Sequence, residues 1–179
     1  IEPTGNQDPF GLRRAAQGIV EVAWTIHRPL PLDALLRLRG SLAPFVNAPP
    51  KAIAKVGLRV ARYLFERLST FAWPPPVPAT DCIEAVLGSP CDDLVDAMDR
   101  IVSLQQLNGQ AGLLKAAKVI ERTHNILKGA ALRQPQVDPN RLQEPLERRL
   151  WELYASHQEE IARLTQDRSY SEATMRYGD

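Results

Sequence analysis

A pair of adjacent arginines offers the clearest chemistry in the sequence. Arg13 and Arg14 lie one turn into a predicted helix, directly after the segment Asn6-Gln-Asp-Pro-Phe. Guanidinium groups near a helix N-terminus can contact phosphate, because both the helix end and the side chains are positive. The spacing alone favours a structural interpretation, in which Phe10 packs over the helix start and the arginines reach solvent or a carboxylate.

Arg122 and Asn125 form a second candidate site on a later predicted helix. Both are surface residues by default. If that helix belongs to a tRNA-binding bundle, both residues would make contacts with the RNA backbone or with bases.

Catalytic and metal-binding patterns are absent from the sequence. His27, His124 and His157 are scattered over separate predicted helices and form no HExxH motif, and no GxxxxGK[ST], GxGxxG or GxSxG is present. Cys82 and Cys91 lie nine positions apart without a CxxC, so we interpret them as ordinary core or loop thiols. We therefore predict no catalytic residue, no metal site and no cofactor in this segment.

Length and composition indicate a folded, water-soluble protein. The chain has 179 residues, of which 44% are apolar, and a formal net charge of +1. No apolar run approaches the roughly 18 residues of a membrane helix, and the start lacks the pattern of a signal peptide. We expect a location in the cytoplasm or in an organelle stroma or matrix. Residues 1–79 carry 10 Lys and Arg against 5 Asp and Glu, and residues 80–179 carry 12 against 16, so the basic excess lies in the first half.

Hydrophobic periodicity predicts an all-α fold made of helical bundles. Asp8-Pro9 is a helix start, with the carboxylate as cap and the proline at the first helical position. Four prolines between Trp73 and Pro78 indicate a stiff spacer, where we place a boundary between residues 1–79 and 80–179. Ser169-x-x-Glu172 is a capping box. The first predicted helix follows Asp8-Pro9. The others span about 32–45, 51–70, 81–87, 92–107, 109–127 and 144–164, with one more beginning near 169.

The string from Pro3 to Ala16 is the longest of several motifs that follow one another along the chain. It resembles the P-x-G-x-x-D-P-F-A-L-R-R-A-A signature of one family, the β subunit of bacterial and organellar glycyl-tRNA synthetase. It departs from that signature in Gly11, where the family usually has alanine. Further resemblances follow in the family's order. They are Phe65-Glu-Arg-Leu68, Asp81-Cys-Ile-Glu-Ala-Val-Leu87, Arg122-Thr-His-Asn-Ile-Leu127, which is similar to the opening of a DALR-type anticodon-binding bundle, and Leu142-Gln-Glu-Pro-Leu-Glu147.

The resemblance implies a division of labour in which the chemistry lies outside this chain. In that family the α subunit holds the active site for ATP and glycine, and the β subunit supplies modules that bind tRNA. Residues 1–79 correspond to a helical body that follows an HD-type domain, and residues 80–179 to the start of the anticodon-binding domain. The family pattern continues beyond the point where this sequence departs from it at Thr174, so we expect a fragment or a chain with an altered end.

Two functions from different classes follow from these observations. In the first, the chain is a non-catalytic, tRNA-binding portion of glycine–tRNA ligase, with tRNA(Gly), the α subunit and the remainder of the β subunit as partners and no membrane. Arg122 and Asn125 would then face the anticodon arm, and Arg13 and Arg14 the acceptor side. The alternative is a helical scaffold derived from that subunit and used for protein contacts.

Overall fold

A computed structural model describes residues 8, 10–32, 59–129 and 137–178. Within these ranges the regular elements are α-helices and short 3-10 helices, and the one β-type pairing is an isolated bridge between Pro31 and Asp93. The predicted all-α fold is confirmed. Contacts divide the chain into two compact units, Ile1–Gln105 and Gln106–Asp179, which we call unit 1 and unit 2 and describe separately.

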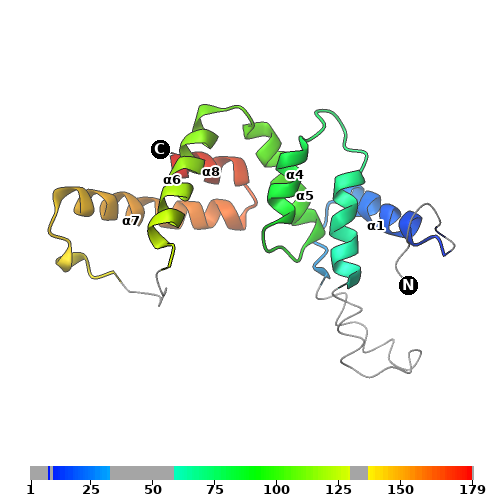
Figure 1. Cartoon of the computed structure of the whole chain (residues 1–179), viewed down its shortest axis with the longest axis horizontal. Helices are drawn as coiled ribbons and strands as arrows, with labels where there is room; N and C mark the ends of the chain where they lie inside the picture. The colour runs from blue at the N-terminus through cyan, green and yellow to red at the C-terminus, as the bar shows by residue number, and fades with distance from the viewer. Residues whose placement is uncertain (1–7, 9, 33–58, 130–136, 179) are drawn as a thin grey trace, which may run out of the picture. The chain divides into compact units, whose positions relative to one another are not determined.

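Unit 1 contains α1 (Leu12–Ile26), a helix over residues 59–66, the 3-10 helix η3 (Arg67–Thr70), α4 (Thr80–Leu87) and most of α5 (Leu94–Leu107), as Figure 1 shows. The observed bounds of α4 and α5 agree with the predicted helices to within two residues. The predicted helix over 51–70 is observed from 59 and tightens to a 3-10 turn at its end. The predicted helix over 32–45 lies outside the described residues apart from its first.

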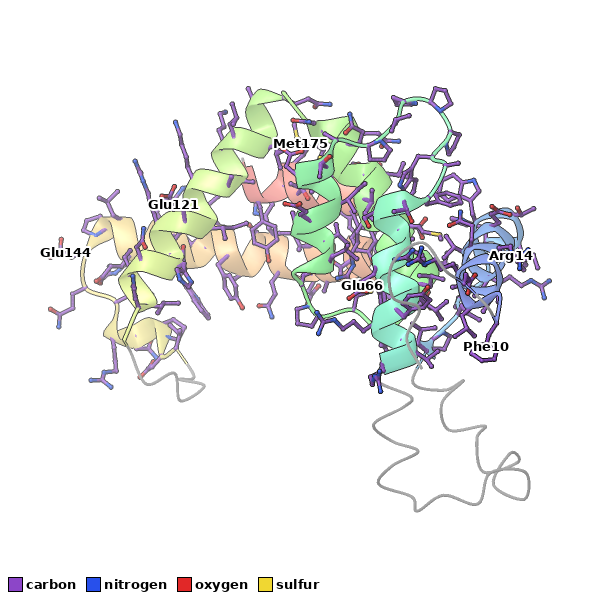
Figure 2. The ribbon with its side chains drawn as sticks, turned by 45° about the vertical axis from the view of Figure 1, so that its right-hand side comes forward. Phe10, Arg14, Glu66, Glu121, Glu144 and Met175 are labelled. Carbon is purple, nitrogen blue, oxygen red and sulfur yellow. The ribbon has the colours of Figure 1, made fainter. Side chains whose placement is uncertain are left out.

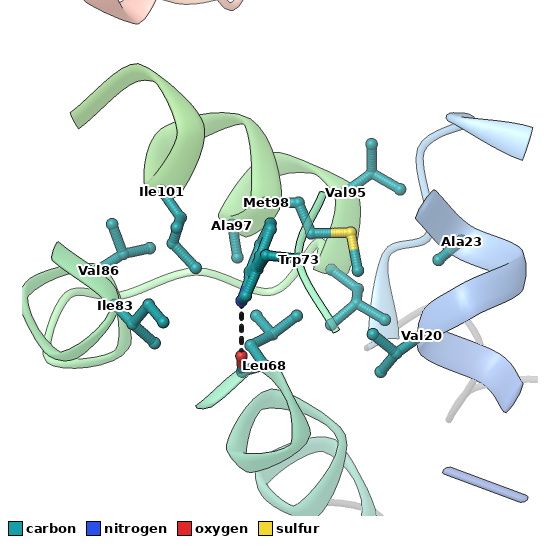
Figure 3. Packing of buried hydrophobic residues seen from close by; sticks show 11 residues of the cluster. Val20, Ala23, Leu68, Trp73, Ile83, Val86, Val95, Ala97, Met98 and Ile101 are labelled. Atoms are coloured by element: carbon teal, nitrogen blue, oxygen red, sulfur yellow. Dashed lines mark hydrogen bonds between the residues drawn. The ribbon is translucent and has the colours of Figure 1, made fainter. Parts of the chain in front are cut away.

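A continuous apolar core holds unit 1 together. Trp73 lies at its centre in Figure 3, where its indole Nε1 donates a 3.0 Å hydrogen bond to the Leu68 carbonyl. That bond satisfies the polar atom of an otherwise buried ring. The surrounding buried side chains come from α1, η3, α4 and α5, and they are Val20, Ala23, Leu68, Ile83, Val86, Leu94, Val95, Ala97, Met98 and Ile101.

The start of α5 is fixed by Asp93 and by the chain that follows α1. One carboxylate oxygen of Asp93 accepts hydrogen bonds from the amides of Val95 at 2.9 Å and Asp96 at 3.0 Å, as expected of an N-cap. The Leu32 amide donates to the Asp92 carbonyl at 2.7 Å. The segment after α1 is therefore tied to the beginning of α5.

The proline-rich segment does not separate two cores. Trp73 and Pro78 are buried, and the core of unit 1 includes residues from both sides of the segment. The compact units meet between Gln105 and Gln106 instead of at the predicted 79/80 boundary. A division by contacts does not identify which family domain a segment belongs to. The assignment of 1–79 to a helical body and 80–179 to an anticodon-binding domain stays a prediction.

Unit 2 contains α6 (Ala111–Leu127), the 3-10 helix η4 (Pro139–Arg141), α7 (Pro145–Gln166) and α8 (Tyr170–Gly178). The start of α7 carries a capping box in which Glu144 and Glu147 satisfy each other's free amides. α8 packs against both α6 and α7. It lies close to α6 at Gly112, where a Cβ would overlap the Met175 side chain labelled in Figure 2.

The 3.6-residue period predicts an inner stripe on α6, but most of it is exposed; its members are Leu113, Ala117, Ile120, Thr123, Ile126 and Leu127. Ala116 is buried, but Ile120 and Ile126 are 60% and 81% exposed. The physical reason is length, because α8 has 9 residues against the 17 of α6 and covers only the first part of its stripe. Within the described part of the chain, no helix is long and apolar enough to cross a membrane, and no group of His, Cys, Asp and Glu is arranged to hold a metal ion.

Candidate nucleic-acid interface

Asp8 positions the first candidate site by capping α1. Its two carboxylate oxygens accept hydrogen bonds from the amides of Leu12 at 2.8 Å and Arg13 at 3.1 Å. These bonds satisfy amides that have no partner within the helix, and the negative charge suits the positive helix end. The predicted cap is confirmed. The helix itself begins at Leu12, three residues after Pro9, so the prediction of a proline at its first position is wrong.

Gly11 permits the turn that leads into α1. Its φ of +66° lies in the left-handed region, which glycine adopts without a Cβ penalty. The Arg14 guanidinium lies over this glycine, with Nη2 3.5 Å from the position that a Cβ would take. An alanine at this position, the usual residue of the resembled signature, would be strained in this backbone conformation.

The two arginines of α1 differ in exposure. Arg14 is exposed, whereas Arg13 is half-buried and already has an interaction partner. Phe10 is 69% exposed, so its ring is not buried against the helix start as predicted. Of this pair, Arg14 is the residue with its charge available to a ligand.

Arg122 and Asn125 lie on the open side of α6. Both are exposed, and among the described residues neither has a hydrogen-bond or ion-pair partner. α8 meets α6 on another side of the helix, at Gly112 and Ala116. Every residue of α6 from Ala117 to Leu127 is exposed.

Lys115 and Lys118 share the face of α6 that carries Arg122 and Asn125. At 3.6 residues per turn the four positions fall within an arc of about 80°, roughly a third of a turn from Gly112 and Ala116. Both lysines are exposed. They lie seven residues before Arg122 and Asn125, a spacing of two helical turns that could have predicted them from the sequence.

The four predicted site residues belong to different units. Arg13 and Arg14 lie in unit 1, and Arg122 and Asn125 lie in unit 2, and each pair is described within its own unit. The α6 site combines several positive charges with an amide and contains one acidic residue, Glu121, on the same helix. Such a surface suits a polyanion better than a small neutral ligand.

The remaining polar groups form no reactive constellation in the described ranges. His27 Nε2 lies 3.2 Å from Asp99 Oδ1, at the end of α1, and His157 Nδ1 lies 2.8 Å from the Leu153 carbonyl. Both cysteines are free thiols, as predicted. Burial, opposed by the Asp93 backbone hydrogen bond and assisted by Asp96, raises the pKa of the Cys91 thiol to about 11. A thiol with so high a pKa is a poor nucleophile at neutral pH.

A comparison with protein families matches residues 1–88 of the chain to the model described as glycyl-tRNA synthetase β subunit. The match covers α1, η3 and α4 and includes the Asp8 cap and the arginine pair.

Curated relatives extend the similarity beyond residue 88. The glycine–tRNA ligase β subunit of Acidobacterium capsulatum is 32% identical over 163 residues, or 87% of this chain and 22% of that protein. The β subunit of Gloeothece citriformis is 30% identical over 151 residues, 80% of this chain and 21% of that protein. That of Dichelobacter nodosus is 27% identical over 177 residues, 99% of this chain and 25% of that protein. The chain thus spans about a fifth to a quarter of the length of these relatives.

Proposed function

Because this chain belongs to the family of glycyl-tRNA synthetase β subunits, we propose that it is a non-catalytic, tRNA-binding portion of glycine–tRNA ligase. In this proposal it supports the ATP-dependent attachment of glycine to tRNA(Gly) by the α subunit. The chain holds tRNA, and the reaction takes place elsewhere in the complex.

The open polar face of α6 is the observation that carries the proposal. Arg122 and Asn125 are exposed side by side with two lysines, and the described residues offer them no carboxylate partner. A guanidinium group can bind a phosphate oxygen pair, and an amide can both donate to and accept from a base edge. Those are the two kinds of contact that tRNA recognition requires.

Arg14 adds a second, smaller point of contact in unit 1. Its exposed guanidinium lies at the N-terminal end of α1, where the helix dipole also favours a phosphate. Arg13 has a partner already and is half-buried, so we assign it to a supporting role in this contact.

The direct test is a filter-binding titration with glycine tRNA and with a version whose middle anticodon base is changed. We expect the chain to bind glycine tRNA with an affinity that falls steeply as salt rises, because phosphate contacts release counterions. Arg122→Ala should weaken binding about 3- to 10-fold, the loss expected for one charged contact.

Arg149→Ala is the matched control for that substitution. Arg149 is exposed on α7 and forms a 3.5 Å ion pair with Glu152. Its substitution removes the same charge from the same unit as Arg122→Ala. Equal losses for the two variants would count against Arg122 as a contact. Equal, weak binding of both tRNAs would contradict recognition of the anticodon by this chain.

A protein-binding scaffold is the second candidate, favoured by the apolar surface of α7. Leu146 and Leu150 are 83% and 69% exposed. An open groove of about 750 Å³ lies beside them, lined by Val137, Leu142, Glu147, Leu150, Trp151, Tyr154 and Gln158. Exposed apolar patches of this kind mark contact surfaces.

Size-exclusion chromatography separates the two candidates. The chain is run with glycine tRNA and, separately, with a glycyl-tRNA synthetase α subunit. Co-elution with tRNA supports the tRNA-binding function. Co-elution with the α subunit alone, without any effect of tRNA, would establish the scaffold in its place.

A further inference from the structure

We propose that Lys115, Lys118 and Arg122 form a phosphate-binding stripe on α6 that holds an RNA backbone irrespective of base sequence. This inference rests on the proposed tRNA-binding function and assigns the mode of binding and two further residues. It assigns the affinity for the RNA backbone and the recognition of bases to different residues, because a lysine that contacts a phosphate cannot distinguish one base from another.

The three cations are spaced along the axis of α6. From Lys115 to Arg122 the helix rises by about 10 Å, at about 1.5 Å per residue, so the three charges follow one another along the axis. A phosphate backbone is also a linear array of charges. A stripe of this length matches more than one phosphate, whereas a compact cluster would match only one.

The charges of the stripe are not neutralised by neighbouring side chains in the described part of unit 2. None of the three cations has an ion-pair partner among the described residues, although other exposed arginines of unit 2 do, such as Arg149 and Arg163. Glu121 is the one acidic residue within α6 and lies beside the stripe without neutralising it. The charges are therefore available to a polyanion.

The salt dependence of binding measures the number of phosphate contacts directly. Each contact contributes about 0.7 to 0.9 to the slope of log K against log salt. The variant Lys115→Gln/Lys118→Gln should make the negative slope shallower by about 1.4 to 1.8. It should also weaken binding about 10-fold at low salt. The loss should be the same for glycine tRNA and for the anticodon-changed tRNA.

Arg149→Gln/Arg163→Gln is the matched control, because it also removes two exposed positive charges from unit 2. We expect it to change the slope by less than half as much. Glu121→Gln provides a gain-of-binding variant, which a folding defect cannot imitate. Removal of the adjacent negative charge should tighten binding about two- to threefold.

The outcomes distinguish this inference from the function on which it rests. If the unmodified chain binds neither tRNA, the proposed function fails and the inference fails with it. If the chain binds tRNA but the lysine variant and the control have equal slopes, only the phosphate stripe is overturned. A loss that differs between the two tRNAs would overturn its independence from base sequence.

Discussion

Unit 1 has an enclosed apolar core, whereas unit 2 buries only a few of its apolar side chains. Leu94, Met98 and Ile101 of α5 have no exposed surface at all. In unit 2 the buried apolar residues are few, and the described ones are Leu107, Ala116, Leu164 and Ala173. Helices with equally clear apolar stripes therefore differ in how much of the stripe is buried, because burial depends on the elements that pack against it.

The apolar stripe of α7 shows this contrast within a single helix. Leu164, near its C-terminal end where α8 follows, is 6% exposed, and Leu146, in its first turn, is 83% exposed. The covered end belongs to a core, and the uncovered end is a surface. Unit 1 is thus built around a closed core, and unit 2 has exposed apolar surface on both α6 and α7.

Truncation of a core side chain should give the largest effect. Leu94→Ala removes a fully buried side chain and should lower the free energy of unfolding of unit 1 by about 3 kcal/mol, through lost burial and an unfilled cavity. Urea denaturation followed by fluorescence measures this in a Trp151→Phe background, where Trp24 and Trp73 report on unit 1. A loss below about 1 kcal/mol would contradict the enclosed core.

Thiol reactivity should show the next largest effect, since Cys91 reports on the closure of unit 1. With its pKa raised from 9.0 to about 11, the thiolate fraction of Cys91 at pH 8 falls by about 90-fold. The stronger nucleophilicity of a more basic thiolate recovers about eightfold of this. In a Cys82→Ala background, alkylation at pH 8 should therefore be about 10-fold slower in the folded chain than in urea.

The pH profile of that alkylation supplies its control. Because the thiolate is the reactive form, the folded rate should rise about tenfold per pH unit until the pH approaches 11. A plateau near pH 9 would mean that the pKa of Cys91 is not raised.

Loss of the α1 cap should have a smaller effect. Asp8→Ala removes the acceptor of two amide hydrogen bonds and should destabilise unit 1 by about 1 kcal/mol, measured by the same urea titration. Asp8→Asn keeps one of the two acceptor oxygens and should recover about half of the loss. Equal losses for both variants would show that the remaining amide oxygen contributes no stabilisation.

Substitution of an exposed leucine in unit 2 should have the smallest effect. Leu146→Gln changes a side chain that is 83% exposed, so the free energy of unfolding should change by less than about 0.5 kcal/mol. Trp151 fluorescence measures it in a Trp24→Phe/Trp73→Phe background. A loss comparable to that of Leu94→Ala would mean that α7 is covered in solution, and the contrast between the units would collapse.

Local signals in the sequence predicted the elements well. Asp8, the proline run and the Glu144 region marked helix ends because capping and proline chemistry act over a few residues. Burial was predicted less well, since the stripe of α6 is readable but the length of the helix that covers it is not. The burial of Trp73 depends on a core shared across the proline segment, and no local pattern reveals that.

The candidate site was also predicted only in part. The role of Arg122 and Asn125 stays a prediction, and the structure places both on an exposed face of α6, on which Lys115 and Lys118 also lie. Which of the paired arginines is free could not be read from the sequence. That difference depends on the Gly11 turn and on the partner of Arg13.

Chemical-shift mapping of the ¹⁵N-labelled chain during titration with glycine tRNA tests the central claim most directly. We predict that the largest changes fall on α6 between Lys115 and Asn125, with a smaller set near Arg14 and none in the core of unit 1. Changes confined to unit 1, or no changes at concentrations where other tRNA-binding proteins saturate, would contradict the account.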